Sequence, residues 1–319
     1  MRRTGSSGPR SADRADPCSA RRRRPLNRSQ TRGARCQILQ TLPFAVIGAT
    51  GQQGGAVVDA LLADGHPLRA LVRDPNSAKS RALAHRGVTL VHADQEDPDS
   101  MVAALAGVAA LFMMTTFAGP KGTEGEVEHG RAIADAAVRA DVPRVVYSSV
   151  GGAERSSGIP HFESKRRVEQ HLAAVIPSHF IRPTFFMENL TSALGGVGEG
   201  EFVLRLPMAG TMPLQLIAVR DIGVVSAAVL VDPTVIDGDA IEIAGDVLTL
   251  DAIADRIGAH LNRASRYEAL PIGALGDDED RKAMFGWFAD TPAYQADLAL
   301  TRALHPTVFD LSTWLEQPR

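Results

Sequence analysis

Short apolar runs alternate with helical patterns between Phe44 and Arg182, and this alternation constrains the fold more than any other feature of the chain. The apolar runs predict strands at residues 44–48, 68–72, 88–92, 109–114, 144–149 and 178–182. Helical patterns lie between them at residues 54–64, 76–86, 98–105, 127–141 and 164–175. Apolar and polar residues hardly alternate within the runs, so most of these strands should be buried on both faces. The sequence therefore predicts an α/β fold, a doubly wound parallel sheet with helices on both faces.

The alternation ends after Pro183. The strand candidates beyond it are residues 202–206, 214–219 and 240–244, and the helical patterns are residues 222–231 and 250–261. This mixture indicates a smaller α+β subdomain, and a length of 319 residues suits one large α/β unit with such an addition. We expect a larger domain over residues 42–184, whose core also receives later segments, and a smaller C-terminal subdomain over residues 185–319.

Residues 1–41 differ in composition from the rest of the chain. Residues 1–40 carry 11 Arg against 2 Asp, a local charge of +9, so that a total of −3 leaves −12 for the remainder. We expect this Arg-rich leader to be disordered, because it has too few apolar groups to offset the entropy of ordering it. It is either a linker-like extension or translated upstream sequence with the true start near Leu39 or Leu42. Both cysteines, Cys18 and Cys36, lie in it.

Composition excludes several classes of protein. Two cysteines cannot form a secreted disulfide framework, and no apolar run approaches the ~20 residues that span a bilayer. The leader lacks the apolar core of a secretory signal. We therefore expect a cytoplasmic protein with no membrane contact. Nucleic acid could be attracted only by the basic leader, because the remainder is acidic.

A glycine loop follows the first predicted strand. Gly48, Gly51 and Gly54 form a G-x-x-G-x-x-G pattern that opens the first predicted helix. The first glycine allows the tight turn, the second lets the backbone approach a pyrophosphate, and the third lets helix and strand pack closely. The helix N-terminus adds N–H donors and partial positive charge. The loop thus predicts a dinucleotide site, to which Thr50 and Gln53 also belong.

The end of the second strand indicates which dinucleotide is bound. An NAD site would place an acid there for the ribose 2′-hydroxyl, whereas this chain has Arg73, whose guanidinium suits a 2′-phosphate. Lys79 could add a second positive charge. Asp74 follows directly and keeps NAD(H) open, and Arg73 could also be a solvated residue at the strand end. We expect NADP(H) in preference to NAD(H).

Further contacts are expected where the other strands end, because ligands of doubly wound sheets bind beyond the carboxyl ends. Asp94 follows the third strand and either meets the adenine amino group or only organises the turn. Thr115 and Thr116 end the fourth strand, and Ser148 and Ser149 end the fifth. No histidine has the spacing of a metal ligand, so no metal site is expected.

Several motifs resemble those of the NmrA-like branch of the atypical short-chain dehydrogenases, which includes the HSCARG-type NADPH sensors. The resemblance covers about residues 44–270 and rests on Val46–Gly51, Leu71–Asp74, Val145–Ser149, His161–Lys165 and Arg182–Asn189. It implies that residues 42–184 form an NAD(P)-binding Rossmann domain and that the C-terminal subdomain lies over the nicotinamide.

The chain departs from the catalytic pattern of ordinary short-chain dehydrogenases. They use a Tyr four residues before a Lys, which puts both on one helical face. Here Lys165 holds the Lys position, but His161 stands in place of the Tyr. His161 either donates the proton itself or packs against the nicotinamide. Lys165 either holds the cofactor ribose or pairs on the surface with Glu169. The three tyrosines lack this spacing to a lysine: Tyr147, Tyr267 and Tyr294.

Three other residues bear on the site. Phe185 and Phe186 follow the sixth strand and should wall the nicotinamide pocket, with a place in the core as the alternative. Asp221 opens a helical pattern and should cap it rather than act as a catalytic acid.

Two functions fit these features. In the first, the protein is a redox-responsive regulator that binds NADP(H) and changes a contact with a partner, as the resemblance implies. In the second, it is an NADPH-dependent reductase of a small carbonyl or quinone compound. The missing Tyr favours the first, although the cofactor itself carries hydride chemistry, so the sequence leaves enzymatic activity open.

Overall fold

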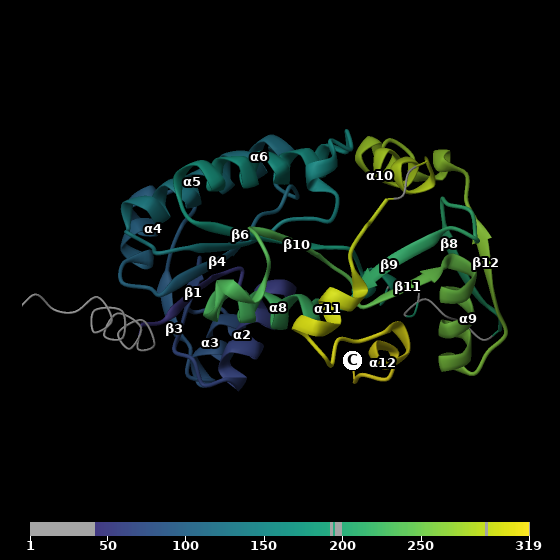
Figure 1. Cartoon of the computed structure of the whole chain (residues 1–319), viewed down its shortest axis with the longest axis horizontal. Helices are drawn as coiled ribbons and strands as arrows, with labels where there is room; N and C mark the ends of the chain where they lie inside the picture. The colour runs from purple at the N-terminus through teal and green to yellow at the C-terminus, as the bar shows by residue number, and fades with distance from the viewer. Residues whose placement is uncertain (1–41, 192–193, 195–199, 291–292, 319) are drawn as a thin grey trace, which may run out of the picture. The chain divides into compact units, whose positions relative to one another are not determined.

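A parallel seven-stranded sheet lies at the centre of the computed structural model, which describes residues 42–191, 194, 200–290 and 293–318 (Figure 1). The strand order is β10-β6-β5-β4-β1-β2-β3. The strands are β1 (Phe44–Ile47), β2 (Leu68–Val72), β3 (Thr89–His92), β4 (Ala110–Met114), β5 (Val145–Ser148), β6 (Ser178–Pro183) and β10 (Ala240–Ile243). The order reverses between β1 and β4, where a ligand crevice is expected beyond the carboxyl ends. The predictions for the leader and its cysteines lie outside the described residues.

Helices cover both faces of this sheet, as Figure 1 shows. One face packs on α2 (Gln52–Ala63), α3 (Ala78–His85) and α8 (Val219–Val231), and the other on α4 (Pro98–Leu105), α5 (Gly122–Arg139) and α6 (Pro160–Val175). Neighbouring residues of a strand point to opposite sides of the sheet. Val46 lies in a first core, with α2 and α8, and Ala45 lies in a second core, with α4 and α5. Because both faces are covered, the strands are apolar almost throughout.

Smaller sheets and helices form the C-terminal part, around a third core. The strands are β7 (Phe185–Phe186), β9 (Pro213–Ile217) and β11 (Asp246–Thr249) in one sheet, and β8 (Phe202–Leu206) and β12 (Ser265–Ala269) in the other. The helices are α9 (Leu250–Leu261), α10 (Glu279–Asp290), α11 (Leu298–Leu304) and α12 (Leu311–Leu315). Short 3₁₀ helices occupy Ala153–Arg155, Met187–Leu190, Pro233–Val235 and Ile272–Leu275. The predicted Rossmann-type α/β fold with a smaller α+β part is confirmed.

Two segments that were predicted for the smaller subdomain pack with the larger domain, whose core was expected to receive later segments. β10 pairs in parallel with β6, with Ile241 opposite Ile181, and α8 packs against α2. A Cβ on Gly223 of α8 would lie 2.4 Å from the backbone carbon of Ala56, so only glycine permits this close approach. Strand β3 also differs from expectation: it is an edge strand, with Thr89 and His92 exposed.

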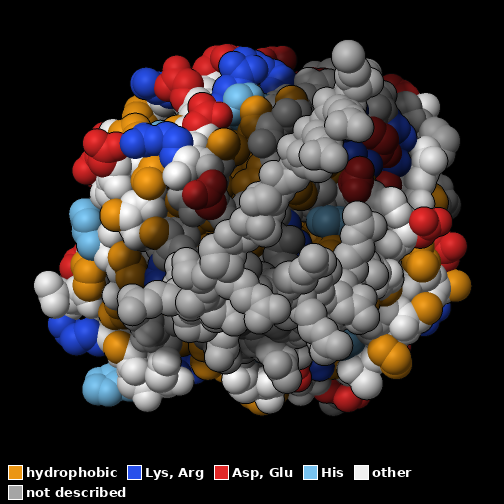
Figure 2. All heavy atoms as spheres, turned by 60° about the vertical axis from the view of Figure 1, so that its left-hand side comes forward, with side chains coloured by type: hydrophobic (Ala, Val, Ile, Leu, Met, Phe, Trp, Pro, Cys, Tyr) orange, Lys and Arg blue, Asp and Glu red, His pale blue; other side chains and the backbone are white. Residues whose placement is uncertain are grey.

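Some charged side chains on the surface form pairs with opposite charges. Arg167 of α6 lies 2.5 Å from Glu124 of α5, and Arg139 lies 2.6 Å from Asp99. Figure 2 shows acidic and basic side chains interspersed over the described part of one face. Exposed pairs of this kind contribute at most about 1 kcal/mol each. No helix of the described residues is long and apolar enough to cross a membrane.

Candidate active site

The glycine loop turns sharply where β1 ends. Gly48 has φ +75°, in the left-handed region that favours glycine, and the N–H of Gly51 donates to its carbonyl at 2.8 Å. A Cβ on Gly54 would lie 2.3 Å from the same carbonyl oxygen. The first turn of α2 therefore sits directly on the loop, at a distance that only glycine allows.

The N-terminus of α2 has no side-chain cap. Gly51 is its N-cap residue, so no side chain accepts hydrogen bonds from the N–H groups of the first turn. Gln53 of that turn is fixed from below, because its Oε1 accepts a hydrogen bond of 2.6 Å from Ser148 at the end of β5. Thr50 lies half-buried in the loop. These donors at a helix N-terminus suit a pyrophosphate group.

The end of β2 presents positive charge to solvent. Arg73 and Lys79 are both exposed, and Arg73 pairs with no carboxylate among the described residues. Asp74 has a local role instead: its Oδ1 accepts the N–H of Asn76 at 2.8 Å, and its carbonyl accepts the hydroxyl of Ser80 at 2.7 Å. This arrangement suits a 2′-phosphate better than a bare 2′-hydroxyl.

The predicted site residues that follow β3 and β4 have local contacts. Asp94 Oδ1 accepts the N–H of Glu96 at 3.0 Å, so the carboxylate does organise the turn after β3. Thr116 is exposed, and its hydroxyl accepts the N–H of Ala118 at 3.2 Å. Thr116 and Glu96 line a groove of about 500 Å³ between the loops that follow β3 and β4. The second oxygen of Asp94 accepts no hydrogen bond within the part of the chain that the structure describes, and so it is available to a ligand.

Lys165 belongs to a buried polar cluster around Glu126. Its Nζ lies 2.7 Å from Oε1 of Glu126 and donates to the carbonyl of Thr115 at 3.2 Å. Thr115 donates its hydroxyl to the same carboxylate at 2.8 Å, and Ser164 donates to Oε2 at 2.5 Å. The alternative that Lys165 pairs on the surface with Glu169 is wrong. Glu169 is itself buried, with arginine partners.

Glu126 was not predicted as a site residue, although the sequence carries a signal for it. It stands four residues before Gly130 and seven before Ile133, which share the buried face of α5. The predicted helix began at Val127, whereas α5 begins at Gly122. An acid at this spacing on an apolar face indicates a buried carboxylate, and a buried carboxylate requires a partner.

His161 is held from the C-terminal part. It lies in the first turn of α6, and Asp280 of α10 accepts its backbone N–H at 2.9 Å. The second oxygen of Asp280 lies 2.6 Å from Nδ1 of the ring, an ion-pair distance at angles unlike those of a hydrogen bond. The ring stacks on Phe117, which follows β4, with centroids 5.1 Å apart. Nδ1 is buried, whereas Nε2 reaches solvent.

None of the three tyrosines takes the place of the missing phenol. Tyr147 is fully buried, its hydroxyl is 2.7 Å from that of Thr115, and burial together with Glu126 raises its pKa well above the ordinary value. Tyr267 donates its hydroxyl to the carbonyls of Leu206 and Met208. The ring of Tyr294 packs among aromatic residues of the C-terminal part, where desolvation raises its pKa.

The serines and phenylalanines at the strand ends have different environments. Ser149 is buried, and its hydroxyl has no hydrogen-bond partner among the described residues. Phe185 is buried in the third core, as the alternative for it had stated, and Phe186 packs against the first. A contact of Phe185 with a nicotinamide stays a prediction.

Asp221 does not cap α8. Its fully buried carboxylate lies 2.8 Å from Nε2 of His305 and accepts the N–H of Phe309 at 2.9 Å, so it fastens α8 to the C-terminal segment. The N-terminal N–H of α8, at Val219, donates to Glu188 instead. Burial raises the pKa of Glu188. The prediction of a cap was wrong because a distant carboxylate supplies it.

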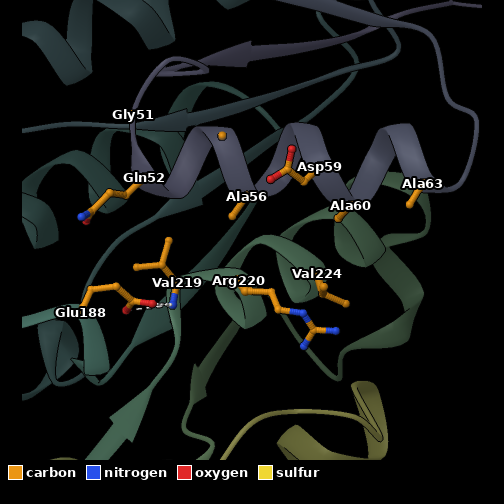
Figure 3. Close-up of a pocket in the computed structure, with 11 residues that line it drawn as sticks. Gly51, Gln52, Ala56, Asp59, Ala60, Ala63, Glu188, Val219, Arg220 and Val224 are labelled. Atoms are coloured by element: carbon orange, nitrogen blue, oxygen red, sulfur yellow. Dashed lines mark hydrogen bonds between the residues drawn. The ribbon is translucent and has the colours of Figure 1, made fainter. Parts of the chain in front are cut away.

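A second groove, of about 530 Å³, runs between α2 and α8 and reaches the glycine loop at Gly51 and Gln52 (Figure 3). The side chains of Ala56, Ala60 and Ala63 point from α2 toward α8. Among the described residues there is no group of three or more His, Cys, Asp or Glu that could hold a metal ion.

Comparisons of the sequence with known proteins identify the family of this chain. The model of the NmrA-like family matches residues 41–309. The chain is 30% identical over 295 residues to the NmrA-like family domain-containing oxidoreductase lnbB of Aspergillus flavus, covering 80% of this chain and 88% of that protein. It is 31% identical over 247 residues to an NAD(P)H azoreductase of Xenophilus azovorans, covering 76% and 80%. A crystal structure of NmrA, a negative transcriptional regulator in complex with NAD, matches with a TM-score of 0.74 at 21% identity, covering 87% and 95%.

Proposed function

Since the chain belongs to the NmrA-like family, we propose that it binds NADP(H) along the carboxyl edge of the main sheet and reduces a small organic acceptor. A reductase is thus the preferred function, although the missing Tyr favours a regulator. Two relatives at 30% identity or more are named an oxidoreductase and an azoreductase. The matches with this chain cover most of the length of both relatives.

The cofactor has a continuous set of ligands in this proposal. The loop from Gly48 to Gly54 and the uncapped α2 hold the pyrophosphate. Arg73, with Lys79, holds the 2′-phosphate. Asp94 and Thr116 contact the adenosine half. The remaining predicted contacts lie nearer the nicotinamide: Thr50, Gln53, Thr115, Ser148, Lys165 and Phe185.

The observation that carries the reductase function is the placement of His161. It stacks on the residue that follows the carboxyl end of β4, Asp280 accepts its backbone N–H and lies 2.6 Å from its Nδ1, and Nε2 reaches solvent. A carboxylate beside one ring nitrogen favours one orientation of the imidazole. Bound NADPH supplies a hydride to the acceptor. The imidazolium gives its Nε2 proton to the acceptor heteroatom and is later reprotonated by water.

The missing phenol also suggests the class of acceptor. Hydride transfer to an aldehyde leaves a strongly basic alkoxide, which needs a positioned acid. Hydride transfer to a quinone leaves a hydroquinone anion, which is a delocalised phenolate and a much weaker base. A histidine at the edge of solvent suffices for such an anion. We therefore expect quinones to be reduced faster than simple aldehydes.

The experiment compares two histidines of one helix. His171 lies near the other end of α6 and also has a carboxylate partner, with Nε2 2.8 Å from Asp135. His161→Ala should lower kcat with a quinone about 100-fold, the lower end of general acid catalysis, with little change in the Kd of NADPH. His171→Ala should change neither. Equal turnover of His161→Ala and the unmodified protein would contradict this role for His161.

A second function, a regulator that responds to NADP(H), is favoured by the absence of the Tyr–Lys pair. In that case the protein binds NADPH but oxidises it no faster with any quinone or azo compound than free NADPH is oxidised. A difference between the affinities for NADPH and NADP⁺ would then be the property to measure.

A further inference from the structure

The cluster around Glu126 joins three elements at the carboxyl edge. Glu126 comes from α5, Lys165 and Ser164 from α6, and Thr115 follows β4. The carboxylate is fully buried, whereas the Lys165 side chain is 13% exposed. Within this pair, solvent therefore reaches only the lysine side chain.

Counting donors shows how the cluster is satisfied. An ionised carboxylate only accepts hydrogen bonds, and three donors converge on Glu126: the hydroxyls of Thr115 and Ser164 and the ammonium of Lys165. Since Thr115 gives its proton to Glu126, the hydroxyl of Tyr147 must donate to Thr115. The hydrogen bonds from Tyr147 to Thr115 and from Thr115 to Glu126 thus run in one direction, with each hydroxyl donating toward the carboxylate.

The ammonium of Lys165 keeps one donor. It has three N–H bonds, of which one goes to Glu126 and one to the carbonyl of Thr115. The third has no acceptor among the described residues. Paired with Glu126, the ammonium adds no net charge, so this donor suits the neutral hydroxyls of a ribose better than a phosphate.

Stability alone is a weak reason for such a pair. Removing two charges from water is costly, and a buried ion pair often stabilises a protein no more than apolar residues of similar size would. What the pair does provide is a fixed position for the ammonium, held from two sides.

We propose that Glu126 is a positioning residue that holds Lys165 against the nicotinamide ribose of NADP(H). This inference rests on the proposed binding of NADP(H). Glu126 does not touch the cofactor and acts through Lys165, whose free N–H binds the ribose hydroxyls.

The test compares two ligands by calorimetry: NADPH, and adenosine 2′,5′-bisphosphate, which has the 2′-phosphate but no nicotinamide ribose. Glu126→Gln keeps the size of the side chain and removes its charge. This variant should bind NADPH about tenfold more weakly, because one charge-assisted hydrogen bond is lost. Its affinity for the bisphosphate should not change. Lys165→Met should do the same, and the double variant should bind NADPH no more weakly than Lys165→Met alone. The matched control is Glu124→Gln, on the same helix and paired with Arg167 at the surface, which should bind both ligands normally.

The outcomes separate the two proposals. If the unmodified protein binds neither ligand, the proposed function fails. If it binds both, and Glu126→Gln weakens both equally or neither, Glu126 has only a structural role or none, and the inference is overturned. Additive losses in the double variant would also overturn it. If Glu126→Gln does not fold, Ser164→Ala removes one donor to the carboxylate, and an unchanged affinity for NADPH in that variant would refute the inference.

Discussion

Adjacent glycines in the first turns of α2 offer a matched pair of substitutions. A Cβ on Gly54 would lie 2.3 Å from the carbonyl oxygen and 2.4 Å from the carbonyl carbon of Gly48, both backbone atoms of the glycine loop. A Cβ on Gly55 would lie 3.6 Å from the carbonyl oxygen of Ala49, an ordinary contact. Gly54→Ala must therefore move helix and loop apart by about 1 Å, whereas Gly55→Ala moves nothing.

The two changes should have opposite signs. Overpacking costs about 1–3 kcal/mol, so Gly54→Ala should lower the free energy of unfolding by that amount. Alanine is favoured over glycine in a helix by about 1 kcal/mol, so Gly55→Ala should raise it slightly. At roughly 2–4 °C per kcal/mol, thermal melts should resolve both shifts.

Binding provides the second assay for this pair. Gly54→Ala displaces the loop expected to hold the pyrophosphate, so it should lower the affinity for NADPH at least about tenfold, the loss of one charge-assisted hydrogen bond. Gly55→Ala should bind NADPH as the unmodified protein does. If both variants melt and bind alike, the close approach of α2 to the loop does not form the site.

Three further predictions concern single side chains. Arg73→Ala should reduce the preference for NADPH over NADH about tenfold in Kd, whereas Arg86→Ala, which removes an exposed pair with Asp59, should not; an unchanged preference would remove Arg73 from the site. Asp280→Asn should lower kcat with a quinone but leave the Kd of NADPH unchanged, and full activity would exclude it as the partner of His161. Because burial raises the pKa of Glu188, the folded protein holds that proton to higher pH than the unfolded chain, so its contribution to stability falls as pH rises above the ordinary value near 4.5. Urea unfolding over a pH series should show this slope in the unmodified protein and a flatter one in Glu188→Gln.

Local pattern predicted most of the main sheet because most of its strands are short buried runs between helices. The bounds of β2, α4, β8 and α9 agree with the predicted ranges to the residue. The glycine loop could also be predicted, because its spacing indicates where the backbone turns sharply and where helix and loop pack closely. The positions of β10 and α8 could not be predicted, because the residues of a strand or helix do not indicate which sheet it will join or cover.

The partners of the site residues were harder to predict than the residues themselves. His161 and Lys165 were found from a motif, but Asp280 is 119 residues from His161, and Glu126 is 39 residues from Lys165. Helical spacing suggested Glu169 for Lys165, and tertiary packing overrode it: Glu169 faces Arg182 of β6. Local spacing does not predict a partner that comes from a distant part of the sequence.

Isotope transfer tests the central proposal most directly. NADPH carrying deuterium at one or the other C4 position of the nicotinamide is incubated with the protein and a quinone or azo acceptor. The NADP⁺ formed is then analysed by mass spectrometry. A reductase that binds one face of the nicotinamide should remove deuterium from only one of the two labelled cofactors, and the other should retain it. Loss from both labels alike, or no oxidation beyond that without protein, would contradict the proposal that this site transfers hydride.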